Sequence, residues 1–427
     1  MIFSNLTSVF WRCWCSPNLK VVPETRETPI PKPEKFPLLT LREELVDNVL
    51  EFMTPLELIS FSLCSKSTKQ LAKAVRNQPK FKKDCKSFKV SFCPLFQRIV
   101  MEIKGFPNTH WQFLQDYGET DRIRDPKTRV LNSISIRNWK PKKQKANLYG
   151  SSPEYSDHEP AVFYSIETFS DYFPFGMNKL LDHINDVYNF PNRVMSVNLN
   201  SSYADRLMAF YKDKDPLEYW VLECTGLLSD ILIKSAFDKQ NASKGLFLRC
   251  ENLSRTFRFD LESFNNVKEN LDIYFAKWVK IEDIFNLKTE RIAIFGSKLE
   301  DGDLRLLINK WREGWNPEWK QFLLEYNQYK VNPDRYFDED CVEITNGRHK
   351  SFIVEDSPVK LFKFKEQKQL RNRNDTVYGY HILRDDGGIA TLQIERSFGV
   401  FIIQSKNESC FQFSSHRCLF EPRVMWQ

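Results

Sequence analysis

The chain has 427 residues, of which 41% are hydrophobic and 28% charged, so it is long enough for two or three globular domains and too apolar for a disordered chain. Its net charge of +6 is mild for this length and does not by itself indicate a nucleic-acid partner. No apolar run is long enough to span a bilayer and the cysteines are scattered, so we expect no membrane contact and an intracellular protein, cytoplasmic and/or nuclear.

Three short helices are predicted within residues 36–80, after a flexible N-terminal tail over residues 1–35 that is rich in proline and charge. Thr40 with Glu43 and Thr54 with Glu57 match the capping-box pattern, and Ser65 is placed to begin the third helix. A unit this small buries little surface alone, so it must pack on the rest of the chain or on a partner.

Residues 81–175 are predicted to hold a strand pair, over residues 87–103, and a flexible connecting region. Within that region, residues 137–160 read as a loop that is first basic and then acidic. Its lysines, from Lys140 to Lys145, are not interleaved with aromatic residues, so we interpret them as a solvated loop rather than a nucleic-acid surface.

Residues 176–330 show a repeating pattern in which a helical segment precedes a short apolar strand. The strands end at Asn200, Cys224, Cys250, Phe275, Gly296 and Tyr326, in steps of 24, 26, 25, 21 and 30 residues. A period near 25 indicates a degenerate leucine-rich-repeat-like α/β domain; an ordinary α/β domain with strands at this spacing is the alternative.

Residues 331–427 are predicted to form a C-terminal β region. The sequence Asp385-Asp386-Gly387-Gly388 lies between two apolar runs and indicates an antiparallel hairpin, with a third strand after it. This region is expected to cover the open end of the repeat. The overall fold class is therefore α/β (α+β overall).

No catalytic motif is found in the sequence. It has no glycine-rich phosphate loop, no nucleophile elbow and no HExxH helix, and none of its six histidines has a second ligand at metal spacing. Asp385 and Asp386 are favoured at a turn for backbone reasons alone. We therefore predict no enzyme activity, no cofactor and no metal.

The stretch FPLLTLREELVDNVLEFMTPLELISFSLCSKSTKQL resembles a nematode-type F-box. Later segments resemble the F-box-associated domain (type 2) of the same family: the helix and Trp-Gly segment before residue 325, and the pattern carried by Arg384, Asp386, Gly387, Ala390 and Thr391. The resemblance implies a substrate-recognition adaptor of an SCF-type ubiquitin ligase, which would bind a Skp-family linker protein, through it a cullin, and an unknown protein substrate.

The residues expected to face the linker lie at the entry and on the first two helices: Phe36, Pro37, Leu38, Leu41, Glu44, Leu45, Val49, Met53, Pro55 and Leu58. The candidate substrate contacts are polar residues of the repeat strands: Asn198, Asn200, Glu223 and Arg249.

Two alternatives remain open. The family usually has a proline where this chain has Arg42, so a repeat scaffold or regulatory binding module without a ligase link is the second hypothesis. A nucleic-acid binder that uses the lysines of residues 140–145 is the third.

Overall fold

The computed structural model divides the chain into two compact units, residues 1–193 and 194–427. The structure describes residues 40–78, 85–92, 96–103, 109–116, 134–136, 142–146, 161–170, 176–188, 194–325, 337, 341–344, 360–370, 373–395 and 398–404. Among these residues, no helix has the length and apolar character that crossing a bilayer requires. Phe36, Pro37 and Leu38 lie outside the described residues.

The first unit begins with helices α2 (Glu43–Glu51), α3 (Pro55–Ser62) and α4 (Lys66–Asn77). The second predicted capping box is confirmed, because Thr54 accepts from the Glu57 backbone N–H at 3.3 Å and the Glu57 carboxylate accepts from the Thr54 N–H at 2.8 Å. Ser65 caps α4 in the same way. The first predicted box is wrong: the N-cap of α2 is Arg42, with no side-chain cap, so the helix begins too late for Thr40 to cap it.

A sheet follows these helices in the first unit. The predicted strand pair is confirmed as β1 (Cys85–Phe92) and β2 (Phe96–Ile103), which are antiparallel. The sheet continues through β3 (Thr109–Asp116) to β6 (Ala161–Ser170), which is parallel to β3. The two strands β4 (Ile134–Ile136) and β5 (Lys142–Ala146) pair antiparallel with opposite ends of β6.

Part of the segment that the sequence predicts as a basic loop forms strand β5 instead. Lys143 is exposed, and its ammonium lies 5.7 Å from the centre of the Tyr164 ring on the neighbouring strand. Backbone pairing with β6 therefore orders a segment whose composition alone indicates a loop.

Helix α6 (Gly176–Tyr188) also belongs to the first unit, although the sequence pattern assigns it to the repeat. Its buried face, with Leu180 and Ile184 fully covered, packs against α3, α4 and the sheet of this unit. The boundary expected at residue 176 thus differs from the unit boundary at residue 193, because α6 completes the core of the preceding residues.

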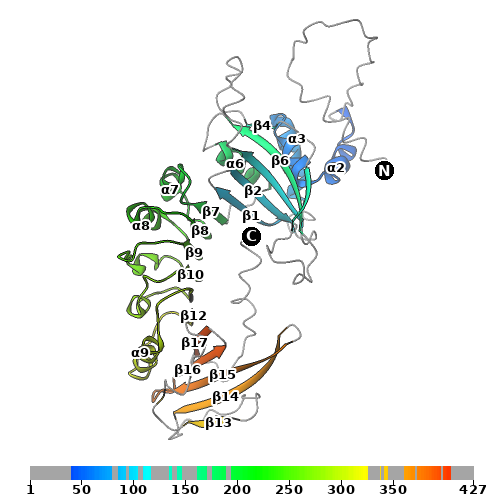
Figure 1. Cartoon of the computed structure of the whole chain (residues 1–427). Coiled ribbons are helices and arrows are strands. Elements are labelled where there is room, and N and C mark those ends of the chain that lie inside the picture. The colour runs from blue at the N-terminus through cyan, green and yellow to red at the C-terminus, as the bar shows by residue number, and fades with distance from the viewer. Residues whose placement is uncertain are drawn as a thin grey trace. The chain divides into compact units, whose positions relative to one another are not determined.

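The second unit contains six parallel strands in one register: β7 (Val194–Asn198), β8 (Tyr219–Cys224), β9 (Gly245–Cys250), β10 (Asn270–Tyr274), β11 (Arg291–Ile294) and β12 (Gln321–Glu325). All six strands stand where the periodic pattern places them. Figure 1 shows them stacked side by side, with the connecting helices on one side of the stack.

The connections between consecutive strands contain either an α-helix or a short 3₁₀ turn. They are α7 (Ala204–Lys212), α8 (Asp230–Lys239), the 3₁₀ turns η3 (Leu261–Phe264) and η4 (Ile281–Ile284), and α9 (Asp301–Arg312). Aromatic rings fill the space between strands and helices, as where Trp220 meets Tyr211 of α7 edge to face at 6.0 Å. The helices therefore cover the strand face that carries Trp220.

The C-terminal strands extend this sheet. They are β13 (Val342–Ile344), β14 (Leu361–Leu370), β15 (Arg373–Leu383), β16 (Ile389–Glu395) and β17 (Phe398–Gln404). The predicted hairpin is confirmed as β15–β16, and the predicted third strand is β17. Because β17 pairs antiparallel with β12, it covers the last edge of the parallel strands, as expected.

The hairpin turn is held by the buried side chain of Arg384. Its Nε and Nη2 donate to the two carboxylate oxygens of Asp386, both at 2.7 Å, and its Nη1 donates to the Trp315 carbonyl at 3.0 Å. The guanidinium also lies 4.2 Å from the centre of the Trp311 ring. Asp386 further accepts from the Gly388 N–H, so this carboxylate has a structural role in the turn.

We predict that Arg384→Ala lowers the free energy of unfolding by about 2 kcal/mol, because it removes the donor to the Trp315 carbonyl and to the Asp386 carboxylate. Urea unfolding would measure the loss. Lys288→Ala is the control, since Lys288 pairs with Glu318 at an exposed site and should change stability by less than about 1 kcal/mol. Equal losses in the two variants would contradict this role.

Candidate functional site

The first candidate site is an exposed apolar patch on α2. Val46 and Leu50 face inward and are buried, whereas Leu45, Val49 and Phe52 are 49%, 37% and 81% exposed. We call Leu45, Val49 and Phe52 the α2 patch. A soluble protein that exposes three neighbouring large apolar side chains on one helix commonly uses them to bind a partner.

The predicted linker-facing residues fall into two groups. Leu45, Val49 and Glu44 are exposed, and Leu41 and Met53 are half-buried. Pro55 is buried and Leu58 is 0% exposed, because α3 is the central helix of the three and is enclosed by its neighbours. Pro55 and Leu58 therefore belong to the internal core and do not contribute to the patch.

Sequence reasoning missed Phe52, the most exposed member of the patch. It lies at the C-cap of α2, one residue beyond the helix, with helical backbone angles. It follows Leu45 by seven residues and Val49 by three, so the same helical spacing that groups those two residues could have found it.

The residue at the family's proline position, Arg42, is exposed and precedes α2 with φ −59°. Proline fixes φ close to this value. The backbone entry to α2 is therefore the one that a proline would give, and the difference from the family lies in the side chain.

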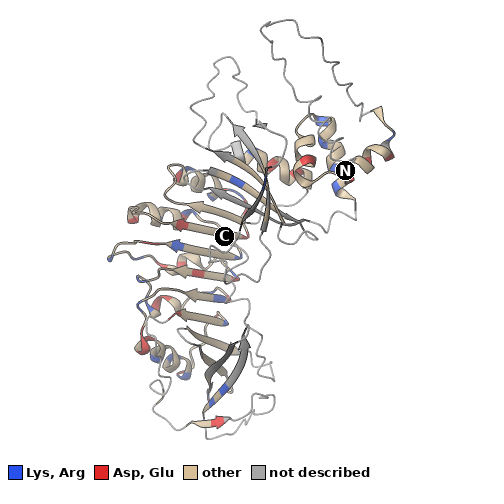
Figure 2. Ribbon diagram, turned by 45° about the vertical axis from the view of Figure 1, so that its right-hand side comes forward, with Lys and Arg blue, Asp and Glu red and all other residues tan. Residues whose placement is uncertain are grey.

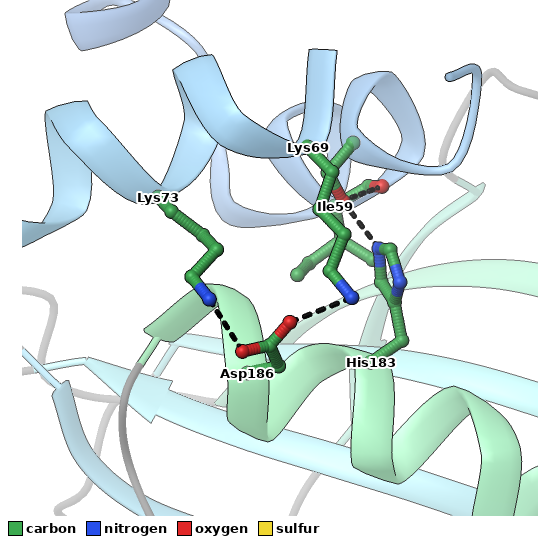
Figure 3. Close-up of polar contacts among 6 residues, drawn as sticks. Ile59, Lys69, Lys73, His183 and Asp186 are labelled. Atoms are coloured by element: carbon green, nitrogen blue, oxygen red, sulfur yellow. Dashed lines mark hydrogen bonds and ion pairs between the residues drawn. The ribbon is translucent and has the colours of Figure 1, made fainter. Parts of the chain in front are cut away.

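Polar contacts attach α3 and α4 to α6 (Figure 3). The Asp186 carboxylate receives Lys69 and Lys73 of α4, one on each oxygen, both at 2.6 Å. Hydrogen bonds from these two ammonium groups lower the pKa of Asp186 to about 2. The guanidinium of Arg76 lies 4.8 Å from the centre of the Tyr188 ring and extends the contact to the end of α6.

A buried hydrogen bond accompanies these ion pairs. The Ser62 hydroxyl donates to the Ile59 carbonyl at 2.6 Å and lies 2.7 Å from His183 Nε2. Because the hydroxyl proton is already used, the ring nitrogen must donate its N–H to Ser62. Burial, together with the nearby Lys69 charge, lowers the pKa of His183 to about 4, so the ring is neutral near pH 7.

This arrangement predicts an acid-dependent loss of stability. The pKa of His183 is 6.5 in the unfolded chain and about 4 in the folded one, so its contribution is complete above pH 6.5 and is lost as the pH falls toward 4. In the variant His183→Gln, the melting temperature should fall less steeply over this window than in the original protein. Ser62→Ala should instead cost about 1 kcal/mol at all pH values in the window.

Thermal melts in buffers across this window would test the assignment. The pair Asp186–Lys69 does not interfere, because the pKa of Asp186 falls to about 2 and its contribution is lost at more acidic pH. If the melting temperature depends on pH in the same way in the original protein and in His183→Gln, His183 is not the titrating group.

The second candidate site is the strand face, by which we mean the side of β7–β12 that faces away from the helices. The shared register arranges its side chains in rows that run across the strands. One row joins Asn198, Glu223, Arg249 and Tyr274, and Phe295 extends it. Three of the four predicted substrate residues are thus brought into one line.

Contacts connect this row from strand to strand. Glu223 and Arg249 form an ion pair at 3.7 Å, and the Arg249 guanidinium lies 4.9 Å from the centre of the Tyr274 ring. Tyr274 stacks on Phe295 at 4.5 Å, and Phe295 meets Phe398 of β17 at 6.5 Å. Each of these side chains is half-buried, so the row is both ordered and accessible.

Asn200, the fourth predicted substrate residue, has a structural role. Its Oδ1 accepts from the backbone N–H groups of Thr225 and Gly226, at 3.0 and 3.4 Å. Asn198 supports the same turn, because its side chain accepts from the Asn200 N–H at 2.9 Å. Asn200 is therefore used to hold the loop after β8.

We predict that Asn200→Ala lowers the free energy of unfolding by about 1–2 kcal/mol, because two backbone donors lose their acceptor. Asn200→Asp keeps an acceptor oxygen and should retain most of this stability. Urea unfolding of both variants would decide. If both variants lose the same amount, the backbone contacts of Oδ1 are not what Asn200 contributes.

Charges of both signs are interspersed along the strands of the second unit (Figure 2). Within the described part of the chain, no group of three or more His, Cys, Asp or Glu side chains is placed to hold a metal ion.

Comparison with known proteins identifies an F-box domain at residues 38–89, which spans the three helices and the start of β1. No curated protein and no solved structure matches the chain. An F-box domain indicates, in general terms, a substrate-adaptor role in SCF-type ubiquitin ligases, and such adaptors are typically non-catalytic. F-box domains generally bind a Skp-family linker.

Proposed function

We propose that this protein is the substrate-recognition adaptor of an SCF-type ubiquitin ligase, with its F-box on a Skp-family linker and its second unit on a protein substrate. The observation that carries the proposal is the α2 patch, an exposed apolar surface within the matched F-box residues. The protein would make no bond itself. It would raise the effective concentration of a substrate lysine near the conjugating enzyme.

The α2 patch has the composition of an interface core. Leu45, Val49 and Phe52 each gain about 1.5–3 kcal/mol when fully buried. Arg42 and Glu44 are exposed nearby and would form a charged rim. Leu41 and Met53, which are half-buried, would complete the surface together with the preceding residues Phe36, Pro37 and Leu38.

The contacts of α6 support a positional role within the first unit. Asp186 and His183 of α6 contact side chains of α4 and α3, so α6 is attached to the two helices that accompany α2. A linker bound on the α2 patch would therefore be fixed with respect to α6 and the sheet of the first unit.

The second unit supplies a surface suited to substrates. We interpret β7–β12 and their connections as a degenerate leucine-rich-repeat-like domain, and the C-terminal strands as part of an F-box-associated domain of the nematode type. Asn198, Glu223 and Arg249 remain candidate substrate contacts because they are half-buried side chains on the strand face.

The test is co-expression of the full chain with a Skp-family linker, followed by size-exclusion chromatography. The original protein should co-elute with the linker. The double variant Leu45→Asp/Val49→Asp should lose the complex, since burying two carboxylates in an apolar interface costs more than about 2 kcal/mol, or roughly thirtyfold in affinity.

Asn48→Asp is the control for added charge, because Asn48 is exposed on the same helix and is not a member of the α2 patch; the substitution adds one negative charge, against two in the double variant. It should co-elute like the original protein, and circular dichroism should show that every variant is folded. If the original protein forms no complex, the scaffold alternative based on Arg42 is favoured. Arg42→Pro then tests whether that side chain prevents binding.

A further inference from the structure

The strand face carries a carboxylate in an unusual place. Asp272 of β10 lies in register between Phe247 of β9 and Ala293 of β11. Phe247 belongs to one buried apolar cluster with Val194 and Val221. Ala293 belongs to a second, whose members are Ala293, Leu323 and Val400. Asp272 keeps part of its exposure whereas Phe247 and Ala293 on either side are buried, so a carboxyl group is placed between two apolar areas.

The neighbouring charges are largely engaged elsewhere. Arg249 is the nearest cation of β9, and it contacts Glu223 and the ring of Tyr274. Glu325 accepts from the Gly296 N–H at 2.8 Å. Burial raises the pKa of Asp272 to about 7, and the Arg249 charge only partly opposes this effect. The Arg249 charge therefore compensates only in part for the burial of the Asp272 carboxylate.

Aromatic side chains lie beside this carboxylate. Tyr274 is two residues further along β10 and so projects from the same face, where it stacks on Phe295. The next residue, Phe275, is 44% exposed and has φ +57°. A bulky residue in this backbone region is uncommon, and such strain gathers at binding sites.

We propose that the strand face binds a protein segment that presents a Lys or Arg side chain to Asp272 and an apolar side chain to the Tyr274–Phe295 stack. The inference rests on the proposed function, since it names the substrate chemistry of the second unit. A cation would form a charge-assisted contact with the carboxylate, and the apolar neighbour would cover the half-buried rings of Tyr274 and Phe295.

The spacing of the groups fits an extended segment. Residues two apart on one strand are separated by about 6.6 Å, which is also the separation of alternate side chains in an extended peptide. A basic residue and an apolar residue two positions away would therefore reach Asp272 and Tyr274 together.

The probe is a library of synthetic nonapeptides in which the central residue is fixed as Arg, Lys, Gln, Glu or Leu and the flanking positions are randomised. The purified full chain should enrich central Arg or Lys over Glu by about tenfold or more, equivalent to a 1.4 kcal/mol preference. Asp272→Asn should abolish this preference, and Asp272→Lys should reverse it toward Glu. Asp238→Asn, an exposed carboxylate on helix α8, is the control and should leave the preference unchanged.

Enrichment that is unchanged in Asp272→Asn, or no preference for a basic centre in the original protein, would overturn the inference. So would a preference that appears only after deletion of residues 405–427, because this would assign the face to the chain's own C-terminal residues. The linker complex is measured in parallel. If the protein keeps its peptide preference but does not bind the linker, only the adaptor role is rejected. If it binds the linker but shows no peptide preference, only this inference is rejected.

The pH dependence gives an independent readout. The other charged or titratable side chains that β7–β12 project from this face are those of Tyr219, Glu223, Arg249, Tyr274, Arg291 and Glu325. In the protein without peptide, the carboxyl of Asp272 has a pKa of about 7, so peptide binding should strengthen as the pH rises through 7. The variant Asp272→Asn should not show this pH dependence.

The stability of the folded chain should change with pH in the opposite sense to peptide binding. The folded chain retains a proton on Asp272 up to about pH 7, whereas the unfolded chain loses it near 3.8, so this group lowers stability as the pH rises between these values. Asp272→Asn should therefore melt at a higher temperature than the original protein above pH 7, and the two should converge toward pH 4. A melting temperature of Asp272→Asn that is lower throughout would contradict the environment assigned to this side chain.

Discussion

The common register of β7–β12 determines which side chains of the second unit can act together. Each strand begins at the same level, so alternation sends one set of residues to the helices and the other set to the strand face. A shift of one residue in any strand would exchange the two sets and place apolar core residues in solvent. The row from Glu223 through Arg249 to Tyr274 exists because every strand keeps this register. The proposed environment of Asp272 depends on it in the same way.

The three F-box helices show a related constraint at smaller scale. They are too few to enclose all of their apolar side chains, so one side is covered within the chain and another is left exposed. Helix α6 covers the first side, with Ser62–His183 and the two lysines on Asp186 as its polar contacts. The α2 patch is the side left open. A linker would be expected to cover it.

Several polar residues that look available for binding are used to hold the backbone. Asn200 accepts from two backbone donors of the loop after β8, and Asp386 accepts from Arg384 and from the turn that it belongs to. Asp272 differs, because its neighbours supply burial but little compensation for its charge. The distinction between a structural and a binding carboxylate here is one of surroundings rather than of residue type.

The sequence by itself determined the features that arise from neighbours along the chain. These include the Thr54 and Ser65 helix starts, the six repeat strands and the Asp-Gly hairpin, because capping, alternation and turn formation act within a few residues. Only the tertiary structure decided that Leu58 is internal while Phe52 is exposed, and that α6 belongs with the F-box helices. Lys73 and Asp186 are 113 residues apart in the chain, and no local pattern records that they meet. Burial and charge at each site depend on such distant neighbours. Individual helices and strands could therefore be predicted from the sequence, whereas the binding surfaces could not.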